Sequence, residues 1–285
     1  MKISAIDIGS NSVRLATCEG GKTLYKRLKT TRLGEGINST GSLKPEAIER
    51  TAQAVADFVK EAKDSDKLYA FATAAVRSAE NGNVFLTRVK ELCGVQVEVL
   101  SGETEARCGL LGAVGFSDGG IIDVGGASTE VTVQCGGKLL YTKSVNIGTV
   151  RLFDGAGRNK AELLKLIDSK ISEYGEFNAS GFNMYAIGGT ASRLASIKNN
   201  LTEYRPEITD GTVITLEEMY ALSDKLLTLS VEQIRATTIC GSSAELVGGG
   251  CLLMAQVMQK FGIERITVKE SDNLEGYIKL KEERL

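Results

Sequence analysis

Two short turns rich in small, hydrogen-bonding residues follow apolar segments in this chain. The first turn reads DIGSNS (Asp7 to Ser12) and the second reads DVGGAST (Asp123 to Thr129). Consecutive backbone N–H groups in such turns can point into one concavity, which is how backbone nests bind phosphate oxygens. The sequence therefore predicts two phosphate-binding turns. Their candidate ligands are Gly9, Ser10, Asn11, Ser12, Gly125, Gly126, Ala127 and Ser128.

The aspartate that opens each turn indicates a metal ion. A carboxylate does not readily contact a phosphate directly, because like charges repel. It can do so through Mg²⁺, which prefers oxygen ligands, or through a water molecule that it holds. We therefore expect Asp7 and Asp123 to lie at a Mg²⁺ site.

The composition of the chain limits the available chemistry. None of the 285 residues is histidine. This excludes a Ser-His-Asp triad, a histidine general base and every histidine-ligated metal site, so acid–base work must fall to carboxylates. A net charge of −2 gives no general attraction for nucleic acid, and we expect no nucleic-acid partner.

The two turns belong to a repeated unit. Asp7 and Asp123 are 116 positions apart (123 − 7 = 116), and the same offset relates the Gly-Gly-Lys segments that begin at Gly20 and Gly136. Each copy reads as a strand, the turn, an alternating strand, a Gly-Gly hairpin into a third strand, an amphipathic helix, a fourth strand and a further helix. The predicted order is βββαβα with an added αβ element.

Local signals place several helices. Pro45 suits the first turn of a helix that continues with apolar residues at helical spacing. The second copy is longer, and its extra residues lie between about Asn199 and Gly241. Two capping boxes, Thr215 with Glu218 and Ser230 with Gln233, predict inserted helices there.

Duplicated βββαβα halves with an Asp-x-Gly turn after the first strand resemble the actin, hexokinase and Hsp70 superfamily. The resemblance implies an α/β fold of two ribonuclease-H-like domains facing a central cleft. We expect the first domain over residues 1–118 and the second, with the inserted helices, over 119–285. The last helix, at about 272–285, is expected to pack back on the first domain.

Two further motifs narrow the resemblance. ATAAVRSAENG (Ala72 to Gly82) and SGETEAR (Ser101 to Arg107), together with the two turns, resemble the exopolyphosphatase and guanosine pentaphosphate phosphohydrolase (Ppx/GppA) family. The likeness is to a short form without the extra C-terminal helical domain. It implies Mg²⁺-dependent removal of a terminal phosphate from polyphosphate. Guanosine pentaphosphate (pppGpp) is the alternative substrate, and a non-catalytic sensor of either molecule is the alternative of another class.

The resemblance also assigns residue roles. It makes Glu105 the base that activates water, and it places Glu130 with Asp123 at the metal and water site. The implied catalytic residues are thus Glu105, Asp123 and Glu130, and the metal ligands are Asp7, Asp123 and Glu130. Arg77 is expected to clamp phosphate, because a guanidinium matches phosphate geometry. The structural alternative for Glu105 is a helix N-terminal acid, worth about 0.5 kcal/mol.

One departure from the family pattern concerns Ala127, which stands where a third glycine is usual. If that position needs a positive φ, alanine costs about 1 kcal/mol, and at negative φ it costs nothing.

Other features concern the setting of the protein. No apolar run reaches the roughly 18 residues of a membrane span, and the N-terminus lacks a signal-peptide pattern. We therefore expect a cytoplasmic protein without a membrane partner. The six cysteines show no C-x-x-C spacing, which favours reduced side chains, and a homodimer is left open.

Overall fold

A computed structural model describes residues 1–115 and 117–282. The chain forms two compact units. Unit 1 contains Met1–Gly112 and the segment from Asn273 onward, and unit 2 contains Ala113–Asp272. The chain thus leaves unit 1 after Gly112, whereas the sequence placed the boundary after residue 118. No helix in the described residues is long and apolar enough to cross a membrane.

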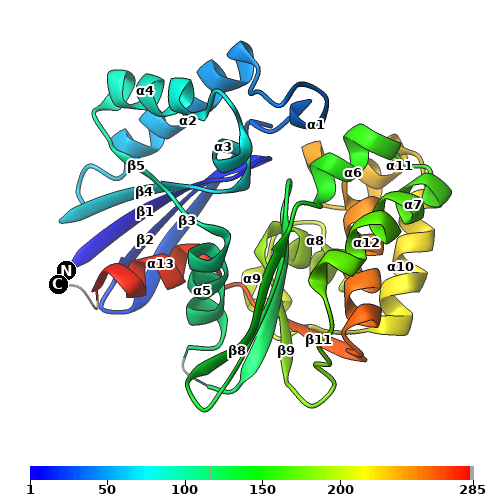
Figure 1. Ribbon diagram of the computed structural model, residues 1–285. Helices are drawn as coiled ribbons and strands as arrows, with labels where there is room; N and C mark the ends of the chain where they lie inside the picture. Colours follow the sequence, from blue (N-terminus) through cyan, green and yellow to red (C-terminus); the bar gives the residue numbers. More distant parts are fainter. Residues whose placement is uncertain (116, 283–285) are drawn as a thin grey trace. The chain divides into compact units, whose positions relative to one another are not determined.

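Unit 1 is built on a five-stranded mixed sheet with the order β3-β2-β1-β4-β5 (Figure 1). The first strand is antiparallel to β2 and parallel to β4. The strands are β1 (Lys2–Ile8), β2 (Ser12–Glu19), β3 (Lys22–Thr30), β4 (Lys67–Ala72) and β5 (Val97–Val99). The helices are α1 (Ile37–Thr40), α2 (Pro45–Glu61), α3 (Ala74–Ser78), α4 (Gly82–Cys93), α5 (Gly102–Ala113) and α13 (Asn273–Glu282).

Alternation along β1 divides its side chains between two cores. Ile6 and Ile8 join the cluster that includes α2 and α4, whereas Ile3 and Ala5 join the cluster that includes α5 and α13. Because side chains alternate across a strand, Asp7 lies on the α5 and α13 side of the sheet. The strand therefore points the aspartate of the first turn toward the helix that carries Glu105.

Unit 2 is built on a six-stranded sheet with the order β10-β11-β9-β6-β7-β8. Its strands are β6 (Gly119–Val124), β7 (Thr129–Cys135), β8 (Lys138–Val145), β9 (Met184–Ile187), β10 (Val213–Thr215) and β11 (Arg265–Val268). Its helices are α6 (Thr149–Ala156), α7 (Lys160–Ile171), η1 (Ser172–Tyr174), α8 (Gly188–Lys198), α9 (Pro206–Thr209), α10 (Leu216–Thr228), α11 (Val231–Thr237), η2 (Gly241–Ser243) and α12 (Val247–Lys260).

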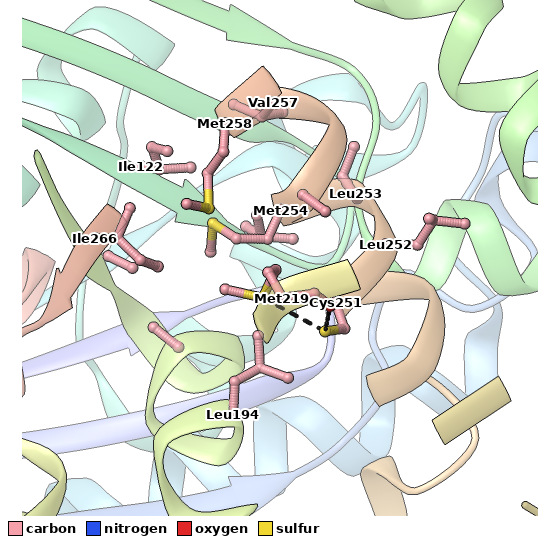
Figure 2. Close-up of a cluster of buried hydrophobic side chains, with 14 of the residues drawn as sticks. Ile122, Leu194, Met219, Cys251, Leu252, Leu253, Met254, Val257, Met258 and Ile266 are labelled. Carbon is pink, nitrogen blue, oxygen red and sulfur yellow. Dashed lines mark hydrogen bonds between the residues drawn. The ribbon is translucent and has the colours of Figure 1, made fainter. Parts of the chain in front are cut away.

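The core of unit 2 gathers around α12, which is apolar on almost every face (Figure 2). Met254 and Met258 of this helix lie near Ile122 of β6 and Ile266 of β11. The Cys251 thiol donates to the Met219 carbonyl oxygen over 3.3 Å. Only one face of β6 supplies this core, because Ile122 and Val124 alternate with Asp123.

The structure confirms the duplication in detail. The hairpin glycines Gly20 and Gly21 both have positive φ, and so do Gly136 and Gly137. A register shift after Thr17 recurs after Val133, 116 positions later (133 − 17 = 116). The predicted helix start at Pro45 and both predicted capping boxes are also confirmed. The six cysteines are free, and four of them are buried.

Candidate active site

The two predicted phosphate-binding turns have the same backbone geometry. In unit 1 the Gly9 N–H donates to the Ser12 carbonyl oxygen over 3.0 Å, and in unit 2 Gly125 does the same to Ser128 over 3.0 Å. A Cβ on Gly9 or Gly125 would approach those carbonyl oxygens to 3.2 and 3.1 Å. Neither glycine has a positive φ. Glycine is favoured here because of the close approach of the backbone.

In each unit, the segment after the Gly-Gly hairpin hydrogen-bonds to the backbone of the phosphate-binding turn. The Gly34 N–H donates to the Ser10 carbonyl oxygen, and the Val150 N–H donates to the Gly126 carbonyl oxygen, both over 2.8 Å. In unit 2 a Cβ on Gly148 would come within 2.6 Å of the Gly126 carbonyl oxygen. Each turn is therefore held by backbone contacts within its own unit.

Ala127 carries no backbone strain. Among the described residues, positive φ outside glycine occurs at Arg32 and Asn200. Ala127 therefore does not have the conformational cost of an alanine at positive φ. Its carbonyl oxygen accepts a 2.8 Å hydrogen bond from Arg151 Nε.

Glu105 is a buried carboxylate in the first turn of α5. It is 6% exposed, whereas Glu103 of the same turn is exposed. Arg77 Nη1 donates to Glu105 Oε2 over 2.9 Å, and Thr73 also hydrogen-bonds to this carboxylate. Burial raises the pKa of Glu105, and the Arg77 guanidinium opposes that rise. A solvated helix-terminal acid would have neither the burial nor the bound guanidinium.

Arg77 contacts the expected base as well as a backbone oxygen. Its Nη1 also donates to the Leu100 carbonyl oxygen over 2.8 Å. The guanidinium is therefore fixed between the end of β5 and α5, where it orients Glu105. A contact between Arg77 and phosphate stays a prediction.

Asp7 lies beside an arginine that the sequence analysis did not assign to it. Arg14 stands opposite Asp7 in the β1–β2 ladder, and its Nε donates to Asp7 Oδ2 over 3.0 Å. The carboxylate is buried, so this ion pair balances its charge within unit 1. The hairpin could have revealed the contact, because a four-residue turn places residues 7 and 14 opposite each other.

Asp123 and Glu130 form an acidic pair in unit 2. They are directly opposite in the antiparallel ladder between β6 and β7, so their side chains share one face of the sheet. Both are buried, at 9% and 2% exposure. The Ser144 hydroxyl donates to Glu130 Oε1 over 2.6 Å.

Helix α8 begins against Asp123. Gly188 is its first residue, with φ of 81°, and a Cβ there would lie 2.6 Å from Asp123 Oδ1. The positive end of the helix dipole therefore lies near the carboxylate and favours its negative charge.

The chemistry of this pair fits Mg²⁺. Two carboxylates that stand opposite each other on one face of a sheet can hold a cation between them. Mg²⁺ is commonly bound by one or two carboxylates, with substrate phosphates and water completing its shell. Within residues 1–115 and 117–282, no three or more His, Cys, Asp or Glu side chains gather into a group that could hold a metal ion.

Comparison with known proteins places the chain in a family. The model of the Ppx/GppA phosphatase family matches residues 15–284. The chain belongs to this family. It is 25% identical to exopolyphosphatase 2 of Mycobacterium tuberculosis, with 96% of this chain and 97% of that protein covered. The structure of an Aquifex aeolicus Ppx/GppA member superposes with a TM-score of 0.80 at 26% identity, covering 100% and 99% of the two chains.

Other relatives are longer than this chain, which spans less than half of their length. A bifunctional 3-dehydroquinate synthase/phosphatase of Fusobacterium nucleatum is 27% identical over 96% of this chain and 46% of its own length. A guanosine-5'-triphosphate,3'-diphosphate pyrophosphatase of Photobacterium profundum is 34% identical over 52% of this chain and 32% of its own length. The likeness thus confirms the family and the fold that the sequence predicted.

Proposed function

We propose that this Ppx/GppA member is a Mg²⁺-dependent exopolyphosphatase that hydrolyses the terminal phosphoanhydride of polyphosphate and releases orthophosphate. The proposal rests on the environment of Glu105. A carboxylate with a burial-raised pKa and a fixed guanidinium beside it is suited to accept a proton from water. A non-catalytic sensor would have no use for a base held in this way.

Each of the other residues has a role in this proposal. The backbone N–H groups and hydroxyls of the two turns bind phosphate oxygens. Asp123 and Glu130 hold Mg²⁺, which when bound supplies positive charge to the transferred phosphoryl group. Asp7 has its charge balanced by Arg14, so we assign it to orienting water rather than to binding the metal directly.

The named relatives support both polyphosphate and pppGpp. Exopolyphosphatase 2 matches over 97% of its length, and two relatives named guanosine-5'-triphosphate,3'-diphosphate pyrophosphatase match over 32% and 46% of theirs. We propose polyphosphate as the substrate, with pppGpp as the equally supported alternative substrate of the same site.

Phosphate release with Mg²⁺ from short polyphosphate, long polyphosphate, pppGpp and ATP tests the proposal. Glu105→Gln is expected to lower turnover by at least ~100-fold, the usual contribution of a general base. Glu103→Gln is the matched control, because Glu103 lies in the same helical turn but is exposed. Release from pppGpp alone would move the assignment to the nucleotide. Unchanged turnover in Glu105→Gln would remove Glu105 from the chemistry.

A further inference from the structure

Ser144 hydrogen-bonds to one carboxylate of the acidic pair and does not itself belong to that pair. It stands opposite Glu130 in the β7–β8 ladder, and its hydroxyl lies 2.6 Å from Glu130 Oε1. Glu130 is 2% exposed, so little water can replace this donor. The bond therefore restricts the direction in which the carboxylate points.

The duplication allows the position of Ser144 in unit 2 to be compared with the equivalent position in unit 1. The residues 116 positions before Glu130 and Ser144 are Arg14 and Leu28, and these two are also opposite each other in their ladder. Unit 1 thus places an arginine beside its turn aspartate and a half-exposed leucine at the serine position. Unit 2 places a second carboxylate there and adds a hydroxyl donor to it. The serine thus accompanies a carboxylate at the position where unit 1 has an arginine.

We propose that Ser144 is a positioning residue that orients Glu130 for divalent-metal binding beside Asp123. The inference rests on the proposed function, because it assumes that the acidic pair binds the metal. A hydrogen bond to a ligating carboxylate fixes its rotamer before the ion arrives. Removing such a partner typically weakens metal binding 10- to 100-fold.

A direct binding measurement tests this role. Mn²⁺ would be titrated without substrate into the full chain, with free Mn²⁺ followed by its paramagnetic resonance signal. We compare wild type, Ser144→Ala, Ser144→Thr and Thr142→Val. Thr142 is the matched control. It lies two residues before Ser144 on β8, and its hydroxyl is 3.2 Å from the hydroxyl of Thr132 on β7. The Mg²⁺ concentration for half-maximal phosphate release is the second readout.

We expect Ser144→Ala to weaken Mn²⁺ binding by about 10-fold and to raise the Mg²⁺ requirement in parallel. Ser144→Thr should retain most of the affinity, and Thr142→Val should match wild type. Equal Mn²⁺ affinity in wild type and Ser144→Ala would overturn the role of Ser144. An equal loss in Thr142→Val would also overturn it, because the effect would then be a general weakening of the ladder. Asp123→Asn is measured as well. If wild type binds no Mn²⁺, or if Asp123→Asn binds it as tightly as wild type, Asp123 and Glu130 do not form the metal site and the proposed function itself is contradicted at this point.

Discussion

At the residue scale, Glu105 combines two opposing influences on one carboxylate. Burial raises its pKa, and Arg77 opposes that rise. If Glu105 is the base, it must be ionised to act. Activity is therefore low when the pH is below the raised pKa and increases as the pH rises through it. The acidic limb of kcat/KM should thus lie at a higher pH than an ordinary glutamate would give.

Replacing Arg77 tests this balance. Arg77→Ala removes the cation that lowers the pKa of Glu105, so the acidic limb should move to still higher pH. Arg77→Lys keeps a positive charge and should move the limb less. Arg88→Ala is the control, because Arg88 pairs with Glu49 away from Glu105. A limb that stays in place in Arg77→Ala would show that the titrating group is not Glu105.

The sequence motifs include the three acidic residues but not their hydrogen-bond partners. The motifs contain or adjoin Glu105, Asp123 and Glu130. In contrast, Arg14 and Ser144 lie on strands and belong to no motif that was assigned a role. Their contacts follow from register, which brings residues 7 and 14, and residues 130 and 144, opposite each other. A sequence pattern records the strand but not the distance across it, so these contacts needed coordinates.

At the element scale, the start of α8 is fitted to Asp123. Gly188 has φ of 81°, and a Cβ there would lie 2.6 Å from Asp123 Oδ1. Gly188→Ala should therefore displace the carboxylate and weaken both Mn²⁺ binding and phosphate release. It should also lower the free energy of unfolding by about 1–3 kcal/mol, because backbone strain and overpacking add.

Substitution of Gly211 separates the effect of backbone strain from the effect of a clash with Asp123. It has φ of 80°, but an added Cβ would meet no atom within 4 Å. Gly211→Ala should therefore show the strain, about 1 kcal/mol in urea unfolding, with normal Mn²⁺ binding. If both variants bind Mn²⁺ equally well, the contact between α8 and Asp123 does not position the carboxylate.

The elements themselves were largely predictable from the sequence. Asp-x-Gly turns, Gly-Gly hairpins and capping boxes act through local backbone chemistry, which a repeat in the sequence makes visible twice. The packing of helices was less predictable. Nothing in the segment EGYI of α13 indicates that Gly276 contacts α5.

At the scale of the whole molecule, the two ends of the chain complete one unit. Helix α13 follows all of unit 2 in the sequence but packs against β1 and β2 of unit 1. Glu275 of α13 contacts Lys26 of β3 over 2.7 Å, and the Tyr277 hydroxyl donates to Glu98 of β5 over 2.6 Å. Unit 1 therefore acquires its last helix only after unit 2 has been synthesised.

The contact between α13 and α5 makes this dependence testable. A Cβ on Gly276 would lie 1.7 Å from the Cys108 carbonyl oxygen, and no rotamer change can relieve a clash with backbone. Gly276→Ala should therefore lower the free energy of unfolding by about 3 kcal/mol. Gly181→Ala is the control, because its added methyl group meets no atom within 4 Å.

Hydrogen exchange would locate the damage in Gly276→Ala. Loss of α13 packing should speed amide exchange in α5, β1 and β2, because these elements share a buried cluster with Leu274 and Tyr277. The amides of β6, β7 and α12 should keep their protection, because their core contains no residue of α13. Equal acceleration in both units would instead mean that the two cores open together, and that α13 stabilises the molecule as a single cooperative structure.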